Sequence, residues 1–131
     1  MTTEIDIKDW LYRLLADILP EGTISGKVYK DQRPVNSKVE DVVIGLPAST
    51  AGQVQMFTAN VNVYVPDIPR KNEMIENTKR LRALSRVFSD LLEYNTQEGL
   101  KAEMQSQHVF KVANMDFHAI NNSIEIRSAN E

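Results

Sequence analysis

The residues best suited to acid–base or metal chemistry are the two histidines and an acid beside one of them. Asp116 and His118 are two positions apart, so in a strand both side chains would point to the same side. With His108 they could bind a metal ion, or form a general base with an orienting carboxylate. A polar surface strand is the more ordinary interpretation, and the absence of a third partner at ligand spacing favours it. We therefore expect no metal site and no catalytic site in this segment.

Neighbouring acids are the second candidate for chemistry. Glu40 and Asp41 begin a β-branched run, and Asp31 lies in the loop before it. Close carboxylates can raise one pKa for acid–base work, although such residues more often form a solvated strand end. The sequence has no glycine-rich phosphate loop after a strand, no GxSxG and no HExxH. It has no cysteine, which excludes disulfides and thiolate nucleophiles. The sequence thus predicts a protein that is not an enzyme and uses no cofactor.

Basic residues gather in the segment expected to form the second helix. Lys79, Arg82 and Arg86 fall at i, i+3 and i+7, so they share a helix face that could contact phosphates or an acidic protein. The ordinary alternative is the solvated back of an amphipathic helix, which we favour. The net charge of −3 argues against general binding of a phosphate backbone, so nucleic acid is a disfavoured partner.

Length and composition indicate one globular domain. The chain has 131 residues, of which 42% are hydrophobic and 25% charged, so residues 1–131 suffice for a single core. The lack of cysteine and of an apolar N-terminal run favours an intracellular setting without a secretion signal. No apolar stretch approaches the length of a membrane span, so we expect no membrane partner.

Two helices are expected from residues with helical spacing. The first covers about 7–19, where apolar residues recur at i, i+3, i+4 and i+7, and Thr3–Asp6 resembles a capping box before it. Pro20 and Gly22 end this helix. The second is expected from about Glu73 to Tyr94, capped by Asn72 and packed on a sheet through an apolar stripe.

The remaining segments predict strands. We expect them at about 24–29, 39–46, 53–65, 108–118 and 123–127, with a loop at 48–52 and a turn at 121–122. Residues 53–65 alternate most clearly, with one apolar face and one half-polar face that either the first helix or another subunit would cover. The order α-β-β-β-α-β-β predicts an α+β fold, with two helices on a mostly antiparallel or mixed sheet. The half-polar face consists of Met56, Thr58, Asn60, Asn62 and Tyr64.

Several short segments in this order are similar to a known family. After the leading amphipathic helix come Lys27-Val28-Tyr29, Arg33-Pro34 and Glu40-Asp41-Val42-Val43-Ile44. A small-residue loop, a long strand ending in Val63-Tyr64-Val65-Pro66 and a long helix follow. The chain resembles the tail terminator proteins of long-tailed bacteriophages, which are also called tail completion or head–tail joining proteins. The element order agrees over nearly the whole chain, and the residue likeness is concentrated between Val28 and Val65.

The resemblance implies a structural protein of phage or prophage assembly. Tail terminators form rings, typically hexameric, at the head-proximal end of the tail tube, and join the tail to the head. The implied partners are other copies of the chain, tail tube proteins and head-connector proteins, without cofactor, membrane or small-molecule substrate. The implied location is the bacterial host cytoplasm during assembly and then the virion tail. Position and charge alone suggest Arg33, Arg70 and Lys71 as contact residues, and the loop at 48–52 could face the lumen of such a ring.

Two other functions compete with this one. The first is a small binding module that contacts nucleic acid or an acidic protein through Lys79, Arg82 and Arg86. The second is a hydrolase or metal enzyme built on Asp116 and His118. Self-association without turnover favours the ring protein, whereas salt-sensitive binding favours the module.

Overall fold

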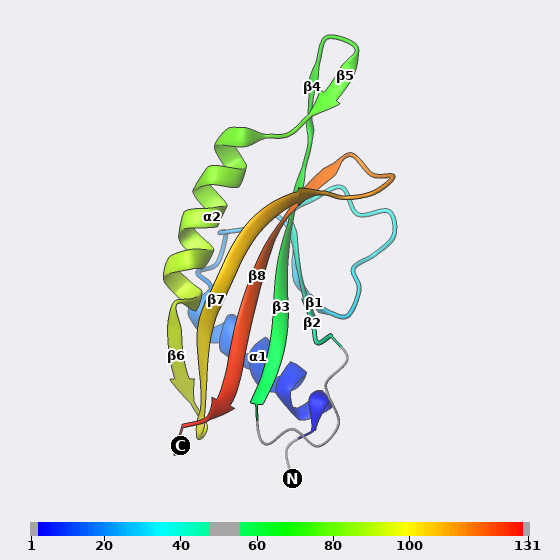
Figure 1. Cartoon of the computed structure of the whole chain (residues 1–131). Helices are drawn as coiled ribbons and strands as arrows, with labels where there is room; N and C mark the ends of the chain where they lie inside the picture. The colour runs from blue at the N-terminus through cyan, green and yellow to red at the C-terminus, as the bar shows by residue number, and fades with distance from the viewer. Residues whose placement is uncertain (1–2, 48–55, 130–131) are drawn as a thin grey trace.

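The computed structural model describes residues 3–47 and 56–129, and in it two helices pack on one face of a curved sheet (Figure 1). The six-stranded sheet has the order β1-β2-β3-β8-β7-β6, and all neighbours are antiparallel except the parallel pair β1 and β2. The predicted α+β class is confirmed. The helices are α1 (Glu4–Ile18) and α2 (Thr78–Leu92). The sheet strands are β1 (Val28–Lys30), β2 (Asp41–Gly45), β3 (Met56–Pro66), β6 (Tyr94–Gln97), β7 (Leu100–Lys111) and β8 (Phe117–Ser128).

The first helix forms where its spacing predicts it. The capping box is confirmed, since Thr3 accepts from the backbone N–H of Asp6 at 3.2 Å and donates its own N–H to the Asp6 carboxylate at 2.9 Å. Both hydrogen bonds with Thr3 favour the charged carboxylate, so they lower the pKa of Asp6 from its usual 3.8. The indole N–H of Trp10 donates to the carbonyl of Gln97 at 2.9 Å, which ties α1 to β6.

The second helix begins later than its sequence suggests. Asn77, and not Asn72, caps it by accepting from the backbone N–H of Arg80 at 3.2 Å. Residues 68–75 instead form a hairpin, which we call the arm, from β4 (Ile68–Arg70) and β5 (Glu73–Ile75). Lys71 takes a positive φ of 55°, which makes the tight turn between Arg70 and Glu73. The arm was missed because three-residue strands carry almost no alternation.

The strand expected at 108–118 is wrong, because residues 112–116 form a turn between β7 and β8, and the turn expected at Asn121–Asn122 is wrong as well. Both residues lie inside β8, where the Asn122 amide donates to the carbonyl of Val61 at 3.0 Å. The turn instead spans 112–116, with Asn114 at a φ of 60°. Cross-strand hydrogen bonds satisfy the two amides and outweigh their local turn preference.

One face of the sheet holds the main hydrophobic cluster. The alternation predicted for residues 53–65 is confirmed from Met56 onward, whereas residues 48–55, including the expected loop at 48–52, lie outside the described residues. The expected strands at 24–29 and 39–46 shorten to β1 and β2. Both helices contribute large buried side chains to the same cluster as the strands. It includes Ile7, Trp10, Leu11, Leu14, Leu15, Val42, Ile44, Val61, Val63, Leu84, Phe88, Ile120, Ile124 and Ile126.

Candidate functional site

The face of the sheet opposite α1 and α2, which we call the open face, is covered by no helix of residues 3–47 and 56–129. Figure 1 views the sheet from this side, with α1 behind it. The interpretation that the first helix would cover the half-polar side of β3 is therefore wrong, because α1 packs on the apolar side. Strand register places β3, β8 and β7 residues side by side here, mostly half-buried and uncharged at the centre. The central residues are Thr58, Asn60, Asn62, Asn121, Ser123, Ser106 and His108.

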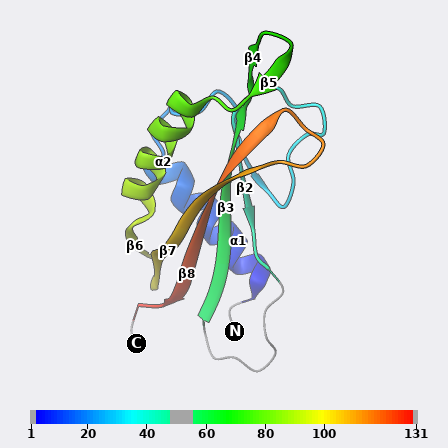
Figure 2. The same cartoon turned by 45° about the horizontal axis from the view of Figure 1, so that its top comes forward.

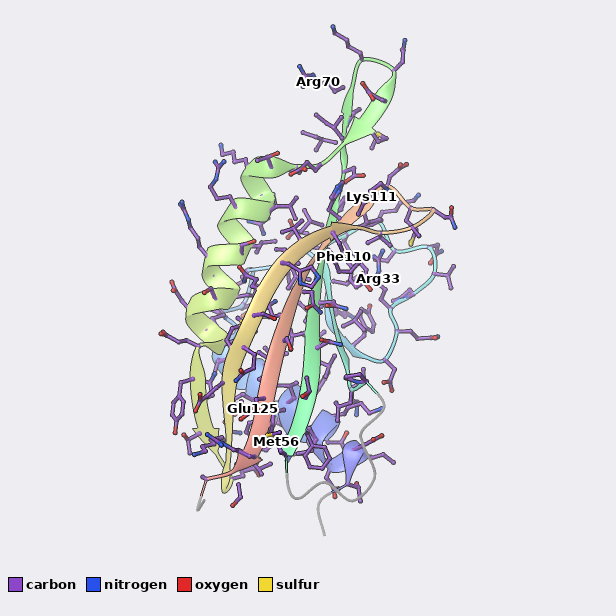
Figure 3. The ribbon with its side chains drawn as sticks, viewed as in Figure 1. Arg33, Met56, Arg70, Phe110, Lys111 and Glu125 are labelled. Atoms are coloured by element: carbon purple, nitrogen blue, oxygen red, sulfur yellow. The ribbon has the colours of Figure 1, made fainter. Side chains whose placement is uncertain are left out.

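Amide side chains form a small ladder at the centre of the open face. The Asn121 amide donates to Asn62 at 2.7 Å and to Asn60 at 3.2 Å across the β3–β8 pair. Met56 and Glu125 lie below this ladder, toward the N-terminal end of β3, as Figure 3 shows. The ladder fixes the amides in place and leaves a polar surface with few charges to desolvate, which suits contact with another protein.

The loop at residues 31–40 covers the upper end of this face through Arg33. The guanidinium lies over the rings of Tyr64 and Phe117, 4.3 Å and 4.2 Å from their centroids, and within 3.4 Å of the Asp41 carboxylate. Its side chain is only 7% exposed. The surface position expected for Arg33 is thus wrong, because cation–π stacking and a buried carboxylate hold it inside. Ser37 also donates to Asp41.

The neighbouring acids are not a solvated strand end. Successive strand residues point to opposite faces, so Glu40 turns to the helix side while Asp41 lies under the loop. Two donors of Arg80 reach Glu40, at 2.5 Å and 2.8 Å, and a third contact joins Arg80 to the carbonyl of Thr23. The hydrogen bond with Glu40 raises the pKa of Arg80 above its usual value. Each carboxylate is therefore held by its own arginine, and neither is free for catalysis.

His118 has an acidic partner, but it is Asp67 and not Asp116. Its Nδ1 lies 2.7 Å from the Asp67 carboxylate, whose side chain is 1% exposed. Asp116 lies exposed in the turn before β8, where only its backbone carbonyl meets the Asp67 N–H. Asp67 follows β3 directly and precedes the arm, so the pair fixes the arm's base. The position of Asp67 between Pro66 and Pro69 is the one sequence signal that could have indicated this pair.

The histidines do not form one site. Register places His108 on the open face opposite Asn121, whereas His118 pairs with Val65 on the helix side. Across residues 3–47 and 56–129, no cluster of three histidine or acidic side chains could hold a metal ion. Within the same ranges, no hydroxyl group hydrogen-bonds to the His118 ring. No helix in the described part of the chain is long and apolar enough to cross a membrane.

The three basic residues on α2 are exposed, as their spacing predicts. Arg82 and Arg86 line grooves between α2 and β7, the larger of about 420 Å³ and also lined by Phe110 and Lys111. Lys79 is exposed on the same helix but lines neither groove. Beyond Met104 the outer edge of β7 pairs with no strand among the described residues, since β6 reaches only Glu103. The exposed arginines of α2 therefore lie beside the unpaired edge of β7.

The arm places the other two candidates away from the body. Arg70 and Lys71 lie at its tip and are exposed, and both views show the arm standing clear of the sheet and helices (Figure 2). Figure 3 shows Arg70 pointing outward from it. Ile68 and Met74, which are 40% and 42% exposed, add apolar surface. Such an arm, with hardly any contact to its own body, is suited to reach a neighbouring molecule.

The comparisons with known proteins add no relative. No protein-family model matches the chain, and no curated protein matches its sequence.

Proposed function

We propose that this protein is a structural subunit of phage or prophage assembly, which forms a ring of the tail-terminator kind at the end of a tail tube. The observation that carries the proposal is the open face, a half-buried polar surface over which the described residues place no helix. In the proposed ring its partners are other copies of the chain, the tail tube and a head connector. The likeness in element order and in the segments between Val28 and Val65 adds the phage setting.

The form of the molecule is suited to this role. A closed ring needs two different surfaces on each subunit that fit one another head to tail. The open face and the arm lie on different parts of the molecule, so they can take part in different contacts between copies. Their polar character agrees with a subunit that is stable before it assembles, because an apolar face of this size would aggregate.

The test is solution mass by light scattering over a concentration series, together with negative-stain images. We expect a closed ring, hexameric if the resemblance holds. Ser123→Arg, which puts a charge in the centre of the open face opposite Asn60, is expected to abolish the ring while the melting temperature stays near that of the parent. The control is Ala83→Arg, because Ala83 is exposed on α2 away from this face. A ring that survives Ser123→Arg would contradict the use of the open face.

A second candidate function rests on the groove between α2 and β7. We propose as the alternative that it binds an acidic, extended segment of a partner protein, which adds a strand to the free edge of β7. Arg82 and Arg86 would pair with the acids of that segment, and Val109 would contact its apolar residues. Glu76 lines one groove and Asp90 the other, so the acids of the segment would lie between them, near Arg82 and Arg86.

This alternative is tested by fluorescence anisotropy with a labelled peptide of alternating glutamate and valine. Binding should weaken steeply with added salt and fall at least tenfold in Arg82→Glu/Arg86→Glu, whereas Lys79→Glu should change it little. A labelled single-stranded oligonucleotide serves as the second probe. Tighter binding of the oligonucleotide than of the peptide would assign the basic face to nucleic acid instead.

A further inference from the structure

A pocket of about 390 Å³ lies at the base of the arm. Three segments that are distant in sequence enclose it: the loop at 31–40, the start of the arm and the turn at 112–116. Figures 1 and 2 both show that loop and that turn side by side below the arm. The volume of the pocket is within the range of pockets that accept small ligands or inserted side chains. The residues that matter are the apolar Val35, Met74 and Met115 and the charged Asp67, Asp116 and Lys38.

Asp67 lines this pocket, but its carboxylate is turned toward His118 and Lys111. One carboxylate oxygen meets His118, but the other, Oδ2, is buried and has no hydrogen-bond partner in the part of the chain that the structure describes. The Lys111 ammonium is 3.7 Å away, beyond hydrogen-bond distance. A buried carboxylate oxygen without a donor is unfavourable. Asp67 is therefore held within its own chain, and the exposed Asp116 is the acidic group of the pocket that a cation from outside can reach.

The arm carries charged and apolar side chains that complement those of the pocket. Residues 68 and 70 share one face of β4, so Arg70 presents five N–H donors beside an apolar Ile68. Among the described residues, no carboxylate pairs with Arg70. Glu73 lies directly opposite Arg70 in the hairpin. The arm therefore offers a cation, an anion and an apolar side chain, and the pocket offers Asp116, Lys38 and an apolar wall.

We infer that the arm of one copy inserts into this pocket of a second copy, with Arg70 toward Asp116 and with Glu73 toward Lys38. The arm cannot fill its own pocket, because Met74 is part of the pocket wall and the arm points away from the body. The contact is head to tail, so repetition of it builds a ring or a filament. The inference rests on the proposed function in one respect, which is that copies of this chain associate.

A charge-swap experiment tests the inference by sedimentation and light scattering of the purified protein. Arg70→Glu and Asp116→Arg are each expected to weaken self-association at least tenfold, and the double variant to recover most of it, because the exchanged charges attract again. Both residues are exposed, so the circular dichroism spectrum and melting temperature should stay those of the parent. Lys79→Glu is the matched control, since it reverses an exposed charge outside the arm and pocket. Lys38→Glu should weaken association through Glu73.

The outcomes separate the inference from the proposed function. A closed ring that neither single variant affects would overturn the arm contact and leave the ring proposal in place. Open filaments or dimers that are lost in each single variant and restored in the double variant would support the contact and contradict the ring. A double variant no better than either single one would overturn the inference. A protein that stays monomeric at every concentration would overturn both.

Discussion

The two faces of the sheet are occupied in opposite ways. On the helix side, α1 and α2 bury a continuous set of apolar residues, with Trp10, Phe88 and Ile124 among the least exposed. On the open face, neighbouring strands present half-buried amides that hydrogen-bond to one another, with half-buried or exposed hydroxyls beside them. The helix side gains its stability within one chain, while the open face is kept polar enough to stay in water. The difference indicates that folding depends on one face and that recognition is left to the other.

We expect the largest loss of stability when a buried side chain is removed from the helix side of the sheet. Phe88→Ala removes a fully buried ring from α2 and is expected to lower the free energy of unfolding by about 3–5 kcal/mol. Urea denaturation monitored by circular dichroism measures it. Thr58→Ala on the open face is the control and should change stability by under about 1 kcal/mol. Equal losses in the two variants would remove the distinction between the faces.

Arg33 is the exception on the open side, because it is buried there like a core residue. Arg33→Ala leaves the Asp41 carboxylate buried with one cation fewer, and we expect a loss of about 3 kcal/mol. Adding Asp41→Asn should recover part of that loss, since it removes the uncompensated charge. Thermal unfolding of the three variants is the measurement. Wild-type stability of Arg33→Ala would show that the loop covers the sheet without holding it.

The amide ladder should contribute less. Asn121→Ala removes two hydrogen bonds from a half-buried position and is expected to lower stability by about 1 kcal/mol. Ser123→Ala, next to the ladder on the same strand, should have a smaller effect. Chemical denaturation resolves the two when both are measured against the parent. A loss comparable with that of Phe88→Ala would mean that the open face also serves as a core.

The smallest effect concerns the cap of α1 and depends on pH. The folded pKa of Asp6 lies below 3.8, so the folded state binds fewer protons than the unfolded state around that pH. The stabilisation is present above pH 3.8 and is lost as the pH falls through the lower folded pKa. The difference in melting temperature between the parent and Asp6→Asn should therefore shrink from neutral pH to below 3.8. A difference independent of pH would assign the cap to geometry and not to charge.

The sequence predicts best those elements whose signal is local and repeated. The helical spacing from Ile7 to Leu15 and the alternation along β3 each involve several residues of one segment, and both are confirmed. The exposure of Arg82 and Arg86 follows from their spacing on one face of the helix.

The parts that were missed depend on contacts between distant segments. Asp67 and His118 are 51 positions apart, and nothing in either neighbourhood indicates the other. Arg33 carries a charge and lies in a loop, so it resembles a surface residue until Tyr64 and Phe117 are placed on both sides of it. The arm has strands too short for any periodic signal. Tertiary contacts decide each of these positions, and composition does not.

The pairing of β3 with β8 has a consequence for how the chain reaches its native state. Val61 and Asn122, which meet at the middle of the sheet, are 61 positions apart. Contacts so distant form slowly, since a long loop must close before they stabilise anything. During synthesis β3 therefore leaves the ribosome well before its partner exists. We expect the complete sheet to form only after β8 has emerged, and chains that end before Phe117 to aggregate through the edge of β3 that β8 would cover.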